Sequence, residues 1–129
     1  MSYFWIALGS AAGGVTRAWA VAWFIRRFDL AQFWGTLAVN VTGSFLVGLL
    51  SAWLVEDSGA NSRAGSAINS LLLIGFCGGY TTFSAFSLQT LQLLREDKWP
   101  MVMANVIASV FGCLLAVGLG YVIGRTFNR

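Results

Sequence analysis

Four long apolar stretches, separated by short polar segments, constrain this chain more than any other feature of its sequence. They cover approximately Tyr3–Ile25, Phe33–Val55, Ala67–Leu94 and Met101–Ile123. A helix needs roughly 20 predominantly apolar residues to cross a bilayer, and each stretch is long enough. Only 10% of the residues are charged, against about 25% in a soluble domain. We therefore predict an all-α integral membrane protein with four transmembrane helices, formed by a single domain over residues 1–129.

The third stretch contains a segment that is poorly suited to an uninterrupted helix, Gly75–Ser87, with the sequence GFCGGYTTFSAFS. Its glycines and hydroxyl residues have low helix propensity. In hydrocarbon every freed backbone group needs a partner, so a break survives only against other protein or a polar path. We predict that Gly78-Gly79 and Thr81-Thr82 unwind, and that a functional site lies there. The freed carbonyls would suit a hard cation such as Na⁺.

The basic residues are divided almost evenly between the two sides of the predicted bundle. With four spans, one side carries Arg63, Arg125 and Arg129, and the other carries Arg26, Arg27, Arg95 and Lys98. Because Lys/Arg asymmetry sets orientation, this balance predicts insertion in both orientations, although a small bias could still fix one. Two opposed copies would form a dual-topology antiparallel homodimer with inverted symmetry and its sites near the midplane.

Small residues recur at four-residue spacing in the predicted helices. The pairs are Gly9 and Gly13, Ser44 and Gly48, Gly112 and Ala116, and Gly120 and Gly124. Such pairs allow helix backbones to approach closely in lipid, but they leave open whether a contact lies within one chain or between chains. Four short helices offer little room for an internal pore, which favours a homo-oligomer.

Acidic side chains and histidine, the usual proton carriers, are missing from the predicted span centres. Histidine is absent, and all five acidic residues lie in loops or at span ends: Asp29, Glu56, Asp57, Glu96 and Asp97. Proton-coupled carriers usually need such a group within the membrane, so passive movement is favoured. A small dual-topology proton-coupled multidrug exporter is the alternative, but it would need a glutamate in the first span. A non-transporting assembly protein is a third interpretation, and it leaves the predicted break unexplained. The sequence offers no nucleophile with a base, and we predict no enzyme.

Polar side chains inside the spans are the candidate site residues. Arg17 is the only charge well inside a span; it either extends to the membrane boundary or is a buried cation that orders the bundle or attracts anions. Thr36, Asn40 and Ser44 share one helix face, which serves either interhelical hydrogen bonding or donation to a ligand. Asn105 and Ser109 form a second, weaker stripe.

Two phenylalanines follow the predicted break on one helix face, Phe83 and Phe86, with Ser84 and Ser87 on a neighbouring face. Alone, such a pair is usually core. Aromatic rings have a positive edge, however. Edges turned toward a narrow passage, beside amide and hydroxyl donors, could hold a small desolvated anion. The combination of break, hydroxyls and aromatics favours that second interpretation.

These motifs resemble the Fluc (CrcB) family of fluoride channels over nearly the full chain. The matching segments are GGVTR at Gly13–Arg17, GTLAVN at Gly35–Asn40 and the Gly75–Ser87 segment. The resemblance implies an antiparallel homodimer in the bacterial inner membrane. It further implies two pores that passively export fluoride from the cytoplasm and relieve fluoride toxicity, with a structural Na⁺ at the dimer centre.

The resemblance also assigns residue roles. It implies that the carbonyls of Gly78 and Thr81 hold Na⁺, that Arg17 is the family's first-span arginine, and that the fluoride pore is formed by Asn40, Phe83, Phe86, Ser84, Ser87 and Ser109. The chain departs from the family at Ala85, Gln89 and Asn105, where threonine, glutamate and tyrosine are common. These differences bear on the details of conduction and leave the family resemblance intact.

Overall fold

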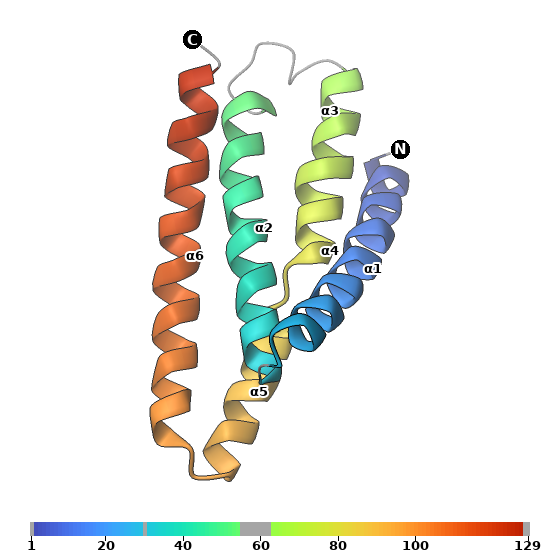
Figure 1. Ribbon diagram of the computed structural model, residues 1–129. Coiled ribbons are helices and arrows are strands. Elements are labelled where there is room, and N and C mark those ends of the chain that lie inside the picture. The colour runs from blue at the N-terminus through green and yellow to red at the C-terminus, as the bar shows by residue number, and fades with distance from the viewer. Residues whose placement is uncertain (1, 30, 55–62, 128–129) are drawn as a thin grey trace.

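The computed structural model describes residues 2–29, 31–54 and 63–127. Across these ranges the chain is helical apart from short connections (Figure 1). The helices are α1 (Ser2–Phe28), α2 (Gln32–Leu54), α3 (Arg63–Asn69), the π-helix η2 (Ser70–Cys77), α4 (Gly78–Tyr80), α5 (Phe83–Arg95) and α6 (Trp99–Phe127). The four elements from α3 to α5 follow one another along the third apolar stretch.

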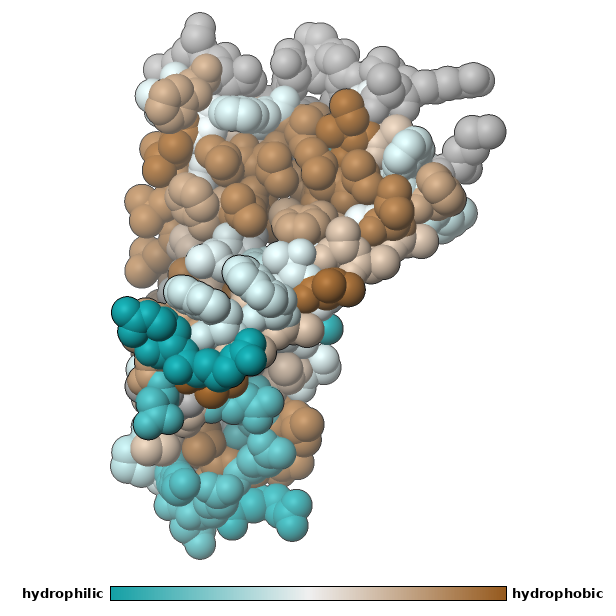
Figure 2. Space-filling model, turned by 45° about the vertical axis from the view of Figure 1, so that its right-hand side comes forward, coloured by the Kyte–Doolittle hydropathy of each residue, from teal (hydrophilic) through white to brown (hydrophobic). Residues whose placement is uncertain are grey.

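Three segments are long and apolar enough to cross a membrane: α2, residues Gly65–Arg95, and α6. Figure 2 shows apolar side chains over much of the upper part of one face and hydrophilic ones from mid-height down to the lower end. The fold is therefore that of a multi-pass membrane protein. Helix α1 has 27 residues, but its arginines and small residues make it less apolar. Its crossing of the membrane stays a prediction.

Helices α2 and α6 run side by side in the same direction (Figure 1). Glycines let their backbones touch: a Cβ atom added at Gly48 would collide with the carbonyl oxygen of Val117, and one at Gly120 would collide with that of Phe45. The close contacts predicted from the small-residue spacing are thus present, and these lie within one chain.

Helix α1 leans across the bundle and packs on η2 and α4 (Figure 1). An added Cβ at Gly9 would collide with the Leu71 carbonyl oxygen, and one at Gly13 with that of Phe76. The π-helical winding of η2 was not predicted, because its sequence SLLLIGFC is almost uniformly apolar and shows no period that distinguishes one helix type from another. Such windings are rare and often lie near functional sites.

The third span breaks at Thr81 and Thr82, which are extended, with φ and ψ of −84° and 157° for Thr81 and −151° and 112° for Thr82. The predicted unwinding of Gly78-Gly79 is wrong, because both glycines belong to α4. Gly79 is needed for packing instead: an added Cβ would lie 2.5 Å from the carbonyl oxygen of Ser10 in α1.

The contact between α2 and α6 gives a matched pair of substitutions. We expect Gly120→Ala to lower the free energy of unfolding by about 1–3 kcal/mol, the usual cost of overpacking, because the new methyl meets the Phe45 backbone. Gly118→Ala, two residues away on the same helix, meets nothing within 4 Å and should be neutral or slightly stabilising. Thermal unfolding in detergent compares the two, and equal melting temperatures would contradict the packing described.

Candidate functional site

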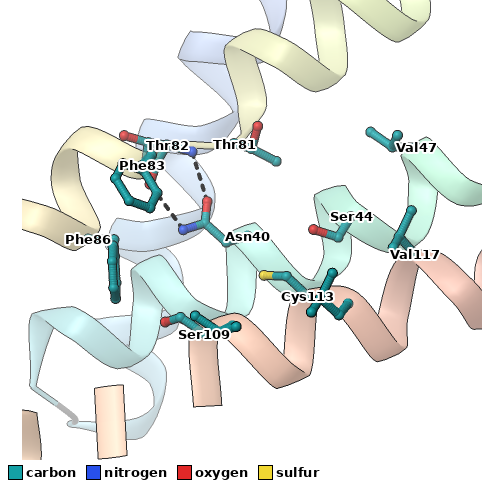
Figure 3. A pocket seen from close by; sticks show the side chains of 12 residues that line it. Asn40, Ser44, Val47, Thr81, Thr82, Phe83, Phe86, Ser109, Cys113 and Val117 are labelled. Carbon is teal, nitrogen blue, oxygen red and sulfur yellow. Dashed lines mark hydrogen bonds between the residues drawn. The ribbon is translucent and has the colours of Figure 1, made fainter. Parts of the chain in front are cut away.

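Asn40 of α2 holds the backbone of the break with two hydrogen bonds. Its Nδ2 donates to the Thr82 carbonyl oxygen at 3.0 Å, and its Oδ1 accepts from the Thr82 N–H at 2.8 Å (Figure 3). Because a carbonyl only accepts and an N–H only donates, this pairing fixes which amide atom is nitrogen. Asn40 is 9% exposed, and one of its two amide hydrogens remains available for another acceptor.

Two further side-chain contacts join α2 to either side of the break. The Thr42 hydroxyl donates to the Ala38 carbonyl at 2.8 Å, so the Tyr80 hydroxyl must donate in its 3.1 Å contact with Thr42 Oγ1. On the other side, Gln89 Nε2 of α5 donates to the buried Thr36 Oγ1 at 2.8 Å. Helix α2 therefore bridges α4, the break and α5.

The break separates carbonyls before it from the N–H donors that a continuous helix would give them, and for two of these donors the structure shows the new acceptor. In an α-helix the N–H of Thr82 would bond Gly78, and that of Ala85 would bond Thr81. Here the Thr82 N–H donates to Asn40, and the Ala85 N–H donates to Thr82 Oγ1 at 3.2 Å, an N-cap of α5. The Gly78 and Thr81 carbonyls have therefore lost their helical donors.

A groove of about 480 Å³, here called the first groove, lies between α2, the break, α5 and α6 (Figure 3). It brings together four of the residues that the sequence assigned to a pore: Asn40, Phe83, Phe86 and Ser109. The two phenylalanine rings lie 5.2 Å apart between centroids and are tilted by 48°. Phe83 is 78% exposed, so its ring stands at the open side of the groove.

A second groove, of about 530 Å³, lies between α1, α2 and α5. Thr82 lines both grooves, so the break separates them. The second groove is lined by the half-buried Arg17, by Thr36 and Gln89, and by Ser84 and Ala85. Its charged side chain and hydroxyl groups make it the more polar of the two.

The serines that the sequence placed on one polar track occupy three different surroundings. Ser109 lines the first groove and Ser84 lines the second. Ser87 is exposed, is among the lining residues of neither groove, and donates to the Phe83 carbonyl at 2.9 Å. The structure therefore does not bring Ser84 and Ser87 together with the two phenylalanines in one groove.

Thr90, which links α5 to α6, was not predicted from the sequence as a site residue. Asn105 Nδ2 donates to Thr90 Oγ1 at 2.9 Å, and Ser109 Oγ donates to Asn105 Oδ1 at 3.4 Å. The Thr90 hydroxyl donates to the Phe86 carbonyl at 2.7 Å. The one available signal was that Thr90 lies one turn after Phe86, on the same face of α5.

The fold and these grooves define a multi-pass helical membrane protein whose candidate site lies at a broken span. The chain matches the family described as CrcB-like protein, Camphor Resistance (CrcB), over residues 4–121. It is 41% identical over 131 residues to a protein of Methylocella silvestris named Fluoride-specific ion channel FluC, covering 100% of this chain and 97% of the relative. A protein of the same name from Magnetococcus marinus is 42% identical over 129 residues, covering 97% of this chain and 98% of the relative.

A third relative of that name, from Paramagnetospirillum magneticum, is 41% identical over 130 residues, covering 100% of this chain and 99% of the relative. The chain belongs to the CrcB family, which confirms the resemblance found in the sequence. This is a family of ion channels and not of enzymes.

The bonds between Asn40 and Thr82 can be tested by amide hydrogen exchange. Asn40→Leu removes both partners of the Thr82 backbone, and we expect the Thr82 N–H to exchange about 10-fold faster or more, since an unsatisfied buried group costs about 1–3 kcal/mol. Ser44→Ala, one turn along the same face, should leave that exchange within about twofold of the parent, well below the effect of one hydrogen bond. Equal exchange in both variants would contradict the assigned role of Asn40.

Proposed function

We propose that this protein is a fluoride-selective channel of the bacterial inner membrane that lets F⁻ leave the cytoplasm passively and so relieves fluoride toxicity. The observation that carries the proposal is the first groove, where one amide, four hydroxyl side chains and two aromatic rings meet without a carboxylate among the lining residues. Relatives that match over the full chain are named fluoride-specific ion channels, which supports the same anion here.

Fluoride is small and strongly hydrated, so a pore must replace its water with other hydrogen-bond donors. The second amide hydrogen of Asn40 and the Ser109 hydroxyl are such donors. The tilt of 48° between Phe83 and Phe86 lets positive ring edges contribute as well. Conduction requires binding that is favourable enough for entry and weak enough for exit, and neutral donors meet that requirement better than a formal charge would.

The same proposal includes an antiparallel homodimer of dual topology with two pores. The first groove is open on the side where Phe83 is 78% exposed, so one chain supplies only part of the wall of a pore. With a second copy related by a twofold axis, each chain would complete the groove of the other, which gives two pores. The near balance of basic residues between the two sides supports opposed insertion, and the exposed apolar side chains of each copy would face its partner or lipid.

A structural Na⁺ at the break belongs to the proposal too. Hard cations take oxygen ligands, and the Gly78 and Thr81 carbonyls have lost their helical donors to Asn40 and Thr82. The described residues contain no group of three or more His, Cys, Asp or Glu side chains that could hold a metal, so backbone oxygens are the fitting ligands. Bound there, Na⁺ would supply the positive charge that the missing helical N–H groups no longer provide.

The decisive experiment measures fluoride, chloride and proton fluxes separately for the purified protein in liposomes. We expect fast fluoride efflux with neither chloride efflux nor obligatory proton exchange, because the groove offers donors but the described spans offer no acidic side chain. Proton-coupled movement of a cationic drug would instead support an exporter. A protein that moves none of these solutes would contradict transport altogether.

The pore assignment predicts the effect of single substitutions in the same assay. Phe83→Ile removes a ring edge from the groove, and Asn40→Asp places an acceptor where an anion needs a donor. We expect either change to lower fluoride efflux by at least about 100-fold, equivalent to the loss of about 3 kcal/mol. Phe111→Ile is the control, since Phe111 is 61% exposed on α6 and does not line the groove. Unchanged efflux in the first two variants would refute the assignment.

The cation proposal predicts that Na⁺ stabilises the protein. At constant ionic strength, replacing K⁺ by Na⁺ should raise the melting temperature, with a gain of about 2.7 kcal/mol at 100 times the dissociation constant. Asn40→Leu removes both side-chain partners of the Thr82 backbone that hold the break in place and should weaken this response, while Ser44→Ala should retain it. A melting temperature that is identical in Na⁺, K⁺ and a large organic cation would argue against the site.

A further inference from the structure

A chain of hydrogen bonds, buried at its Ser109 end, runs from the first groove to the backbone of α5. It links Ser109 to Asn105 at 3.4 Å, Asn105 to Thr90 at 2.9 Å, and Thr90 to the Phe86 carbonyl at 2.7 Å. Asn105 is 2% exposed and Ser109 is 8% exposed. Both ends of the chain belong to residues that line the first groove, Ser109 and Phe86.

The direction of every bond in this chain is forced by its last member. The Phe86 carbonyl can only accept, so Thr90 donates its one hydroxyl proton to that carbonyl. Thr90 Oγ1 must then accept from Asn105 Nδ2, which turns Asn105 Oδ1 toward Ser109. An amide oxygen can only accept. Ser109 therefore donates its single proton to Asn105.

This polarity matters for an anion in the groove, because Ser109 then presents lone pairs where the anion needs a proton. To bind the anion, the hydroxyl must turn away from Asn105 and leave the buried Oδ1 without its partner. The bond that must break is the weakest of the three: at 3.4 Å it is much longer than the usual 2.7–2.8 Å of an O–H···O contact. The exchange is therefore feasible, but it opposes binding.

We propose that Asn105 is a positioning residue that competes with the permeating anion for the Ser109 proton and so sets the groove's anion affinity and selectivity. The inference rests on the proposed channel function. A small, hard anion such as fluoride is a strong acceptor and displaces the amide oxygen. A larger halide is a weaker acceptor and leaves Ser109 bonded to Asn105. The competition favours fluoride over chloride and keeps fluoride binding weak enough for release.

The test is a double-mutant cycle read from the half-saturating fluoride concentration and the fluoride-to-chloride flux ratio in liposomes. Asn105→Leu frees the Ser109 proton and should lower the half-saturating concentration by up to about 10-fold, the factor that one net hydrogen bond represents, while the flux ratio falls. In a Ser109→Ala background the same substitution should change the half-saturating concentration less than twofold, which is below the effect of one hydrogen bond. In a Ser44→Ala background, where another groove residue is altered, the full effect should remain.

A second variant keeps the test valid if Asn105→Leu does not fold. Thr90→Val is nearly isosteric and releases the constraint on the Asn105 amide, which can then turn its Nδ2 toward Ser109. Ser109 becomes an acceptor of that bond, and its proton is free for the anion. Thr90→Val should therefore shift affinity and selectivity in the same direction as Asn105→Leu.

The outcomes separate the inference from the proposed function. A parent protein that passes no fluoride overturns the channel proposal, and the positioning role of Asn105 with it. A parent that conducts, with variants whose half-saturating concentration rises or shifts equally in the Ser109→Ala background, overturns only the inference. A purely structural role of Asn105 would give that second pattern, because lost packing does not depend on the Ser109 hydroxyl.

Discussion

The pair of hydrogen bonds between Asn40 and Thr82 is the interaction on which the site depends. A break at membrane depth exposes an N–H and a carbonyl that hydrocarbon cannot satisfy, and one amide side chain satisfies both. Its effect extends further along the chain. By occupying the Thr82 N–H, Asn40 deprives the Gly78 carbonyl of its helical donor, and the Thr82 side chain does the same to Thr81 through its cap. The side chains that permit the break thus also bond the N–H groups that would otherwise return to Gly78 and Thr81.

Glycines bring α2 close to the break and to α6. A Cβ atom at Gly43 would collide with the Thr81 side chain, and one at Gly48 would collide with α6. Single interhelical hydrogen bonds in membranes contribute little, about 0.6 kcal/mol on average. Their importance here lies in specificity, since the contacts of α2 with α4, the break and α5 are satisfied together in one register. Packing sets the distance between helices, and the polar contacts select the register.

The sequence allowed the apolar stretches, the region of the break and the glycine contacts to be predicted, because each depends on composition or short spacing. It could not give the pairing of Asn40 with Thr82 or of Gln89 with Thr36, since these depend on which faces of distant helices meet. The error at Gly78-Gly79 has a related cause: glycine lowers helix propensity and also permits close packing, and a sequence does not separate the two uses. Ser84 and Ser87 were grouped by spacing, yet one lines a groove with Arg17 and the other does not.

The donors of the first groove share a property that bears on conduction: much of their hydrogen-bonding capacity is already used within the protein. One amide hydrogen of Asn40 bonds the Thr82 carbonyl, and the Ser109 proton bonds Asn105. An anion that enters therefore gains the free Asn40 hydrogen and the ring edges directly, but gains the Ser109 proton only in exchange for an existing bond. Such a groove cannot hold an anion as tightly as the same donors would if all were free. Under the proposed function, the polar contacts that order the helices also limit how tightly the groove binds an anion, and rapid passage requires such weak binding.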